Sequence, residues 1–99
     1  MIAYHFLPPA EEEMHEAARY YEEQAEGLGE EFLDDVQRSI DSVRMFPEIG
    51  SMIEPPLRRH LLSRFPYSVV YAREPETIVV VAIAHHRRRP GYWRERLES

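Results

Sequence analysis

The sequence predicts an α+β fold with the element order β-α-α-β-β-β, in which an N-terminal helical hairpin packs on a small, mostly antiparallel sheet. Three observations lead to this prediction. A short alternating segment opens the chain, and two stretches with apolar residues at helical spacing follow it. After a loop rich in proline, three segments contain many β-branched and aromatic residues, which is typical of strands.

The first predicted element is a strand, because Ile2, Tyr4 and Phe6 alternate with smaller or more polar residues. Prolines at positions 8 and 9 end it and suit the first turn of a helix. The apolar face of that helix comprises Met14, Ala17, Ala18, Tyr21 and Ala25. The acidic run Glu11 to Glu13 suits the positive end of the helix dipole, and we expect it to be a solvated helix face.

Gly27 is well placed to end the first helix in a left-handed conformation. A second helix then carries its apolar face on Leu28, Phe32, Val36, Ile40 and Val43, and Pro47 ends it. Because so few residues join the two helices, we expect an antiparallel hairpin.

Residues 46–56 contain three prolines and one glycine and are predicted to form a loop. Strands are predicted at 60–65, 67–73 and 77–84, with a tight turn at 74–76 between the last two. The segment 78–83 is almost continuously apolar, which favours a central strand covered on both faces.

Composition narrows the class of protein. With 99 residues, the chain is expected to form one domain over residues 1–99. The absence of cysteine excludes disulfides, a thiol nucleophile and thiolate metal sites. The five histidines lack metal-ligand spacing, and no glycine-rich phosphate loop is present, so we expect neither a metal nor a cofactor. No apolar run is long enough to span a membrane, and a cytoplasmic location is expected.

The formal net charge of −6 is unevenly distributed. Residues 1–57 have a balance of −11, whereas residues 58–99 have a balance of +5. All twelve basic side chains are arginine, whose planar group suits carboxylates and phosphates. The overall sign argues against direct binding of nucleic acid by the chain alone.

The segment after the last predicted strand is the main candidate for chemistry. Between His85 and Arg94, arginines flank Tyr92 and Trp93 on both sides, a pattern that can bind phosphates and stack on bases, with a histidine as general acid or base. The alternative is a solvated basic tail whose two aromatic residues fold back on the core. A second basic group comprises Arg58 and Arg59, with Arg64 nearby in sequence.

Taken together, these motifs resemble the RelE/ParE superfamily of bacterial type II toxins, and within it the ParE-like, or plasmid stabilisation, branch. The matching features, spread over nearly the whole chain, are Ala17-Ala18-Arg19-Tyr20-Tyr21-Glu22, Gly27-Leu28-Gly29 with Phe32, Phe46-Pro47, Phe65-Pro66-Tyr67 with Tyr71, and His85-x-x-Arg88-x-Pro90-x-Tyr92-Trp93. The resemblance implies the same helical hairpin on a small sheet.

The resemblance implies one of two activities. The ParE-like branch inhibits DNA gyrase by protein contact, whereas the RelE-like branch cleaves messenger RNA on the ribosome. RelE-type nucleases tend to carry an arginine just after the Phe-Pro-Tyr turn, where this chain has Ser68. No catalytic residue is therefore favoured; in the nuclease alternative the residues would be Arg64, His85, Arg88 and Tyr92. A degenerate toxin that only binds its antitoxin is a third possibility.

The resemblance also implies a cognate antitoxin, with which the chain would form a hetero-oligomer. The basic half offers arginines for acidic antitoxin side chains, and bidentate arginine–carboxylate pairs would give orientation as well as affinity. The residues expected to bind partners are Arg58, Arg59, Arg64, Arg88, Tyr92, Trp93 and Arg94.

Overall fold

The computed structural model describes residues 1–97. Its elements are β1 (Ala3–Phe6), α1 (Pro8–Gln24), α2 (Leu28–Met45), β2 (Ser51–Glu54), β3 (Leu57–Leu61), β4 (Tyr67–Glu74), β5 (Thr77–His85) and a 3-10 helix, η1 (Arg94–Leu97). The strands form one sheet in the order β1-β5-β4-β3-β2. Only β1 and β5 pair in parallel, so the predicted α+β fold with a mostly antiparallel sheet is confirmed.

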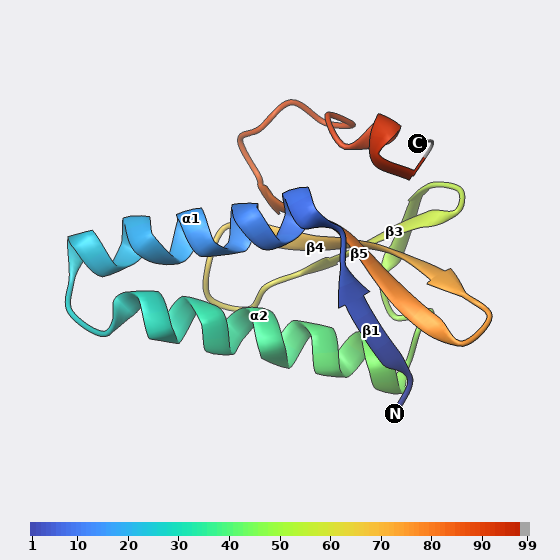
Figure 1. Ribbon diagram of the computed structural model, residues 1–99, viewed down its shortest axis with the longest axis horizontal. Coiled ribbons are helices and arrows are strands. Elements are labelled where there is room, and N and C mark those ends of the chain that lie inside the picture. The colour runs from blue at the N-terminus through green and yellow to red at the C-terminus, as the bar shows by residue number, and fades with distance from the viewer. Residues whose placement is uncertain (98–99) are drawn as a thin grey trace.

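The two helices form the expected antiparallel hairpin (Figure 1). Gly27 has a φ of +85°, which confirms its left-handed conformation, but α1 already ends at Gln24 and Gly27 is instead the N-cap of α2. The Glu22 carboxylate accepts hydrogen bonds from the N–H groups of Gly27 and Gly29 at 3.0 Å each, and thereby satisfies free amides at the start of α2. A Cβ on Gly29 would lie 2.5 Å from the carbonyl oxygen of Ala18, so glycine allows the helices to approach closely here.

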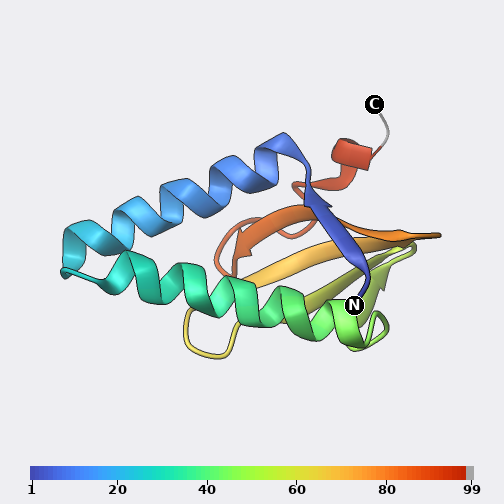
Figure 2. The ribbon, with the colours of Figure 1, turned by 60° about the horizontal axis from the view of Figure 1, so that its bottom comes forward.

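The hairpin covers one face of the sheet (Figure 2). The core on this face includes Phe32, Ile40 and Tyr71, while on the other face Val70 and Val81 pack with Trp93 of the C-terminal segment. Strand β5 lies between β1 and β4 and is buried from Ile78 to Ala84, as predicted for a central strand with both faces covered.

Two sequence-based boundaries were wrong. Strand β2 lies inside the segment predicted as a loop, and β3 covers Leu57–Leu61 instead of the predicted 60–65, so residues 62–66 form a loop. All four residues of β2 are exposed, so no apolar alternation reveals the strand, which depends on pairing with β3. The 62–66 loop instead docks on the buried Asp35 carboxylate, which accepts hydrogen bonds from the Ser63 hydroxyl at 2.8 Å and the Arg64 N–H at 2.9 Å.

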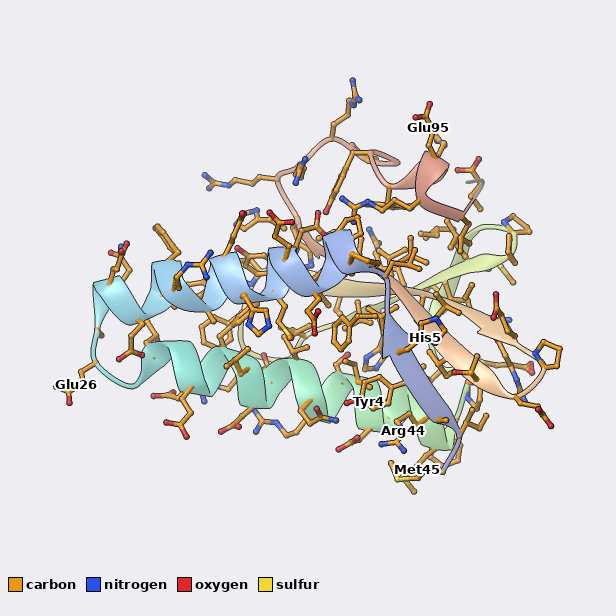
Figure 3. The ribbon with its side chains drawn as sticks, in the orientation of Figure 1. Tyr4, His5, Glu26, Arg44, Met45 and Glu95 are labelled. Atoms are coloured by element: carbon orange, nitrogen blue, oxygen red, sulfur yellow. The ribbon has the colours of Figure 1, made fainter. Side chains whose placement is uncertain are left out.

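Polar contacts fix the end of α2. The Arg44 Nε donates to the Ile2 carbonyl at 2.7 Å, and its guanidinium carbon lies 4.8 Å from the centre of the Tyr4 ring (Figure 3). The buried Tyr71 hydroxyl donates to the Pro47 carbonyl at 2.8 Å and accepts from the Gly50 N–H at 3.0 Å. These contacts anchor α2 and the following connection to the sheet.

Candidate functional site

A small cavity of about 210 Å³ lies between α1 and the end of β5. Its polar and aromatic lining comes from α1 (Glu13, Glu16, Tyr20), β4 (Tyr67), β5 (His85) and the following segment (Arg88, Tyr92). The structure therefore brings His85, Arg88 and Tyr92 together, as the segment's pattern predicted. It adds a pair of carboxylates that the sequence analysis did not assign to a site.

The Glu13 carboxylate is the centre of hydrogen bonding at this cavity. The Arg96 guanidinium donates to both of its oxygens at 2.9 Å, and the Tyr92 hydroxyl donates at 2.8 Å. The Arg88 guanidinium donates at 3.4 Å. The side chains of Glu13 and Arg96 are only 13% and 18% exposed, so this bidentate pair is largely withdrawn from water.

Glu13 and Arg96 also provide hydrogen-bond partners for backbone groups of β5 that do not pair with β1. Strand β1 pairs with β5 as far as Val80. Beyond that residue the Ile83 N–H donates to Glu13 at 3.1 Å, and Arg96 donates to the Val81 carbonyl at 2.9 Å. A strand edge withdrawn from water needs such partners, so the ion pair replaces the missing strand.

The prediction that Glu11 to Glu13 form a solvated helix face is therefore wrong for Glu13, although Glu11 and Glu12 are exposed. A signal for Glu13 was present in its spacing. It follows Ala10 by three residues and precedes Ala17 by four, which places it on the face where both alanines are buried. Arg96 was also missed, and nothing in the sequence separates it from the neighbouring exposed Arg94.

Tyr92 is held between cations and a carboxylate. The guanidinium carbons of Arg88 and Arg96 lie 3.9 Å and 5.1 Å from the centre of its ring, within range of cation–π attraction. Burial raises the pKa of Tyr92 well above its usual value, and its hydrogen bond to Glu13 raises that pKa further. Tyr92 is therefore a protonated hydrogen-bond donor at neutral pH.

His85 and Tyr67 form another part of the wall, with ring centres 4.9 Å apart in an edge-to-face arrangement. The Nδ1 atom of His85 accepts a hydrogen bond from the Arg87 N–H at 3.0 Å, so the neutral ring carries its proton on Nε2. Burial raises the pKa of Tyr67 to about 12, and repulsion from the negative charges that Tyr21, Tyr20 and Glu13 carry when ionised adds to this increase. Tyr67 thus stays protonated at neutral pH.

Two positions important for the nuclease alternative lie outside the cavity. Arg64 is absent from its lining and pairs with Glu31 of α2 at 2.7 Å. Ser68 is buried, with its Oγ 2.9 Å from Nε2 of His86. Because neighbouring residues of a strand point to opposite faces and Tyr67 faces the cavity, Ser68 faces the other side of the sheet.

Two of the remaining predicted partner-binding arginines already make contacts within the chain. Arg58 donates to the carbonyl oxygens of Glu48 and Gly50 at 3.2 Å and 2.8 Å. Arg94 pairs with Glu54 at 2.6 Å, with both side chains at least half exposed. Arg58 therefore supports the connection before β2, while Arg94 lies at the surface.

The other two predicted partner-binding residues differ in exposure. Arg59 is exposed on β3. Trp93 is only 7% exposed and belongs to the core on the face opposite the hairpin, and its indole N–H has no hydrogen-bond partner within residues 1–97. Of the two aromatic residues of the segment, Tyr92 lines the cavity and Trp93 folds back on the core.

Residues 1–97 include no group of three histidine, aspartate or glutamate side chains placed to hold a metal ion. Neither α1 nor α2 combines the length and the apolar character needed to cross a membrane.

Comparison with known proteins places this fold in a known class. The chain is similar to a solved structure described as the chromosomal ParDE TA system from P. aeruginosa, with a TM-score of 0.68 and 18% sequence identity, over 86% of this chain and 96% of that one. This likeness shows a shared fold. No curated protein matches the chain.

The sequence itself establishes the family. The family model described as ParE toxin of type II toxin-antitoxin system, parDE, matches residues 4–90. The chain belongs to this ParE toxin family, which confirms the resemblance based on its motifs. Membership in a toxin–antitoxin module implies an antitoxin partner.

Proposed function

We propose that this ParE-family chain inhibits DNA gyrase by protein contact, without being an enzyme itself. We further propose that a cognate antitoxin neutralises it in the cytoplasm by forming a hetero-oligomer with it. The observation that carries the proposal is the position of Glu13. Its carboxylate accepts hydrogen bonds from Arg88 and Tyr92, two groups that a nuclease would direct at a phosphate.

The electrostatics of the cavity support protein contact over RNA cleavage. Phosphodiester cleavage needs cationic groups aimed at the charge that develops on the phosphate. Here Arg88 is paired with Glu13, a second carboxylate from Glu16 lines the same cavity, and Arg64 is paired elsewhere. The net charge of −6 also opposes docking among ribosomal RNA phosphates.

Ribosome-dependent cleavage of messenger RNA is the second candidate function, and one observation favours it. His85, Arg88 and Tyr92 line the same cavity, and a histidine side chain in this position can act as a general acid or base in phosphodiester cleavage. In this alternative these three residues carry the chemistry.

Induced expression in bacteria tests the proposal. A gyrase inhibitor should trigger the DNA-damage response while translation continues, and co-expression of the antitoxin should prevent that response. Arrest of translation with cuts inside ribosome-bound messages would support the nuclease alternative instead. Growth unaffected by a chain that still binds the antitoxin would identify a degenerate toxin.

The exposed arginines of the basic half are the proposed contact surface for the antitoxin. Arg59 is exposed, and Arg94 remains exposed beside its surface partner Glu54, so both guanidinium groups can reach acidic antitoxin side chains. Changing both to glutamate (Arg59→Glu with Arg94→Glu) should weaken antitoxin binding by at least about tenfold in a calorimetric titration. Arg19→Glu reverses the charge of an exposed arginine on α1 and serves as the control for a charge reversal outside the proposed surface. A double variant no weaker than this control would remove the two arginines from the interface.

A further inference from the structure

The part of the cavity nearest the middle of α1 presents a carboxylate and aromatic rings. Glu16 and Tyr20 follow Glu13 along α1, and both are exposed. Tyr67 and His85 complete this part of the wall. Within residues 1–97, the Glu16 carboxylate forms no ion pair.

The neighbouring part of the site shows how the same groups accommodate cations. There the Arg88 guanidinium lies over the Tyr92 ring and reaches the Glu13 carboxylate. Arg96 lies near the same ring and pairs with the same carboxylate. A carboxylate beside an aromatic ring therefore holds guanidinium groups of this chain, an arrangement that combines ion pairing with cation–π attraction.

We propose that Glu16, Tyr20, Tyr67 and His85 form a binding site for an arginine or lysine side chain of a protein partner. The cationic end group pairs with the Glu16 carboxylate, and the rings of Tyr20 and Tyr67 contact the end group and its aliphatic stem. This inference rests on the proposed function, because it assumes that the chain acts through protein contacts. It adds the chemistry of one such contact.

The charges around the cavity favour a cation over an anion. Two carboxylates and one guanidinium line the cavity, and that guanidinium is already paired with Glu13. The volume of about 210 Å³ lies below the range typical of small-molecule sites and suits the end of one side chain.

The site can be tested with the isolated chain and a small cationic probe. N-acetyl-arginine amide should shift the NMR signals of Tyr20, Tyr67 and His85, whereas N-acetyl-citrulline amide, its neutral counterpart, should not. Glu16→Gln should abolish the shifts. Glu12→Gln, which removes an exposed charge from the same helix outside the cavity, should retain them. Absence of shifts with the arginine derivative, or shifts of the same signals by inorganic phosphate alone, would overturn the proposal.

The same pair of variants identifies the source of the cation. Glu16→Gln should weaken either antitoxin binding or gyrase inhibition by about fivefold relative to Glu12→Gln, consistent with the loss of one partly exposed ion pair. Loss in the first assay assigns the cation to the antitoxin, and loss in the second assigns it to gyrase. Equal behaviour of the two variants in both assays overturns the proposal.

Failure of the proposed function can be recognised separately. A wild-type chain that does not inhibit gyrase contradicts the gyrase mechanism, whereas the probe titration and the antitoxin assay still decide whether this site binds a cation.

Discussion

Replacing Glu13 with alanine is the most informative test of how this fold is held together. One carboxylate accepts hydrogen bonds from Ile83, Arg88, Tyr92 and Arg96, and so joins α1, the free edge of β5 and the C-terminal segment. Glu13→Ala removes all of these acceptors at once. We therefore expect a large loss of stability from a change at one helical position.

The magnitude follows from the donors that lose their acceptor. Each such donor, if withdrawn from water, costs about 1–3 kcal/mol, which applies to the Ile83 N–H and the Tyr92 hydroxyl. Breaking a buried ion pair costs about 3–5 kcal/mol, but Arg96 retains the Val81 carbonyl and some contact with water. We expect the free energy of unfolding to fall by about 3–5 kcal/mol in total. That is a substantial part of the roughly 5–15 kcal/mol typical of folded proteins.

Urea unfolding, followed by circular dichroism and by fluorescence of the single tryptophan, measures this loss directly. Trp93 is a suitable reporter because it is buried in the segment that Glu13 holds. The control is Glu12→Ala, an exposed neighbour that should change stability by less than about 0.5 kcal/mol. Glu13→Gln keeps one acceptor oxygen and provides a milder variant if the alanine variant does not fold. A loss below about 1 kcal/mol for Glu13→Ala, or one equal to that of Glu12→Ala, would refute the reasoning.

Three further predictions concern the framework around the site. Gly29→Ala should destabilise the chain by about 1–3 kcal/mol in urea unfolding, because its Cβ would lie 2.5 Å from the Ala18 carbonyl oxygen; an unchanged midpoint would contradict this. Tyr71→Phe should cost about 1–3 kcal/mol, because the buried hydroxyl is hydrogen-bonded to two backbone groups of the 46–50 connection, and a loss within error would show that water replaces it. Burial alone would raise the pKa of Asp35, but hydrogen bonds from the 62–66 loop and a nearby arginine outweigh it and hold the pKa below its usual value. The stability that Asp35 contributes should thus be complete above its unfolded pKa of about 4 and be lost as pH falls through the folded pKa; Asp35→Asn should remove this part of the acid dependence, and unfolding curves with the same pH dependence would contradict it.

The predicted parts of the fold are those with a strong local pattern. The helical spacing of Phe32, Val36 and Ile40 and the left-handed position of Gly27 were sufficient to define the hairpin. The continuous apolar run of β5 indicated a strand covered on both faces. In each case burial is regular along one element, and the sequence records that regularity.

The missed features depend on contacts between distant segments. Strand β2 has no buried side chain, and its hydrogen bonds to β3 are the property that makes it a strand. The buried residues Leu62 and Phe65 gave the 62–66 loop the apolar character of a strand, although its path depends on hydrogen bonds to Asp35 of α2. Likewise, the pairing of Glu13 with Arg96 spans most of the chain and leaves no local pattern at the arginine.

Only part of the candidate site could be predicted from the sequence, because its residues come from segments that are distant in sequence. The segment from His85 to Tyr92 was predicted as the main candidate for chemistry because its residue types are adjacent in sequence, and three of its residues line the cavity. The carboxylates that change its chemistry come from α1, so the sequence pattern suggested a basic site where the structure has a mixed one. The sign of the local charge is the feature that required three-dimensional information.

The most direct test of the proposed function is supercoiling of relaxed plasmid by purified gyrase in the presence of the purified chain. The proposal predicts inhibition that increases with the amount of chain and is reversed by the antitoxin, while the same preparation leaves ribosome-bound messenger RNA intact. Full supercoiling at a large excess of the chain, together with cleavage of that RNA, would contradict it.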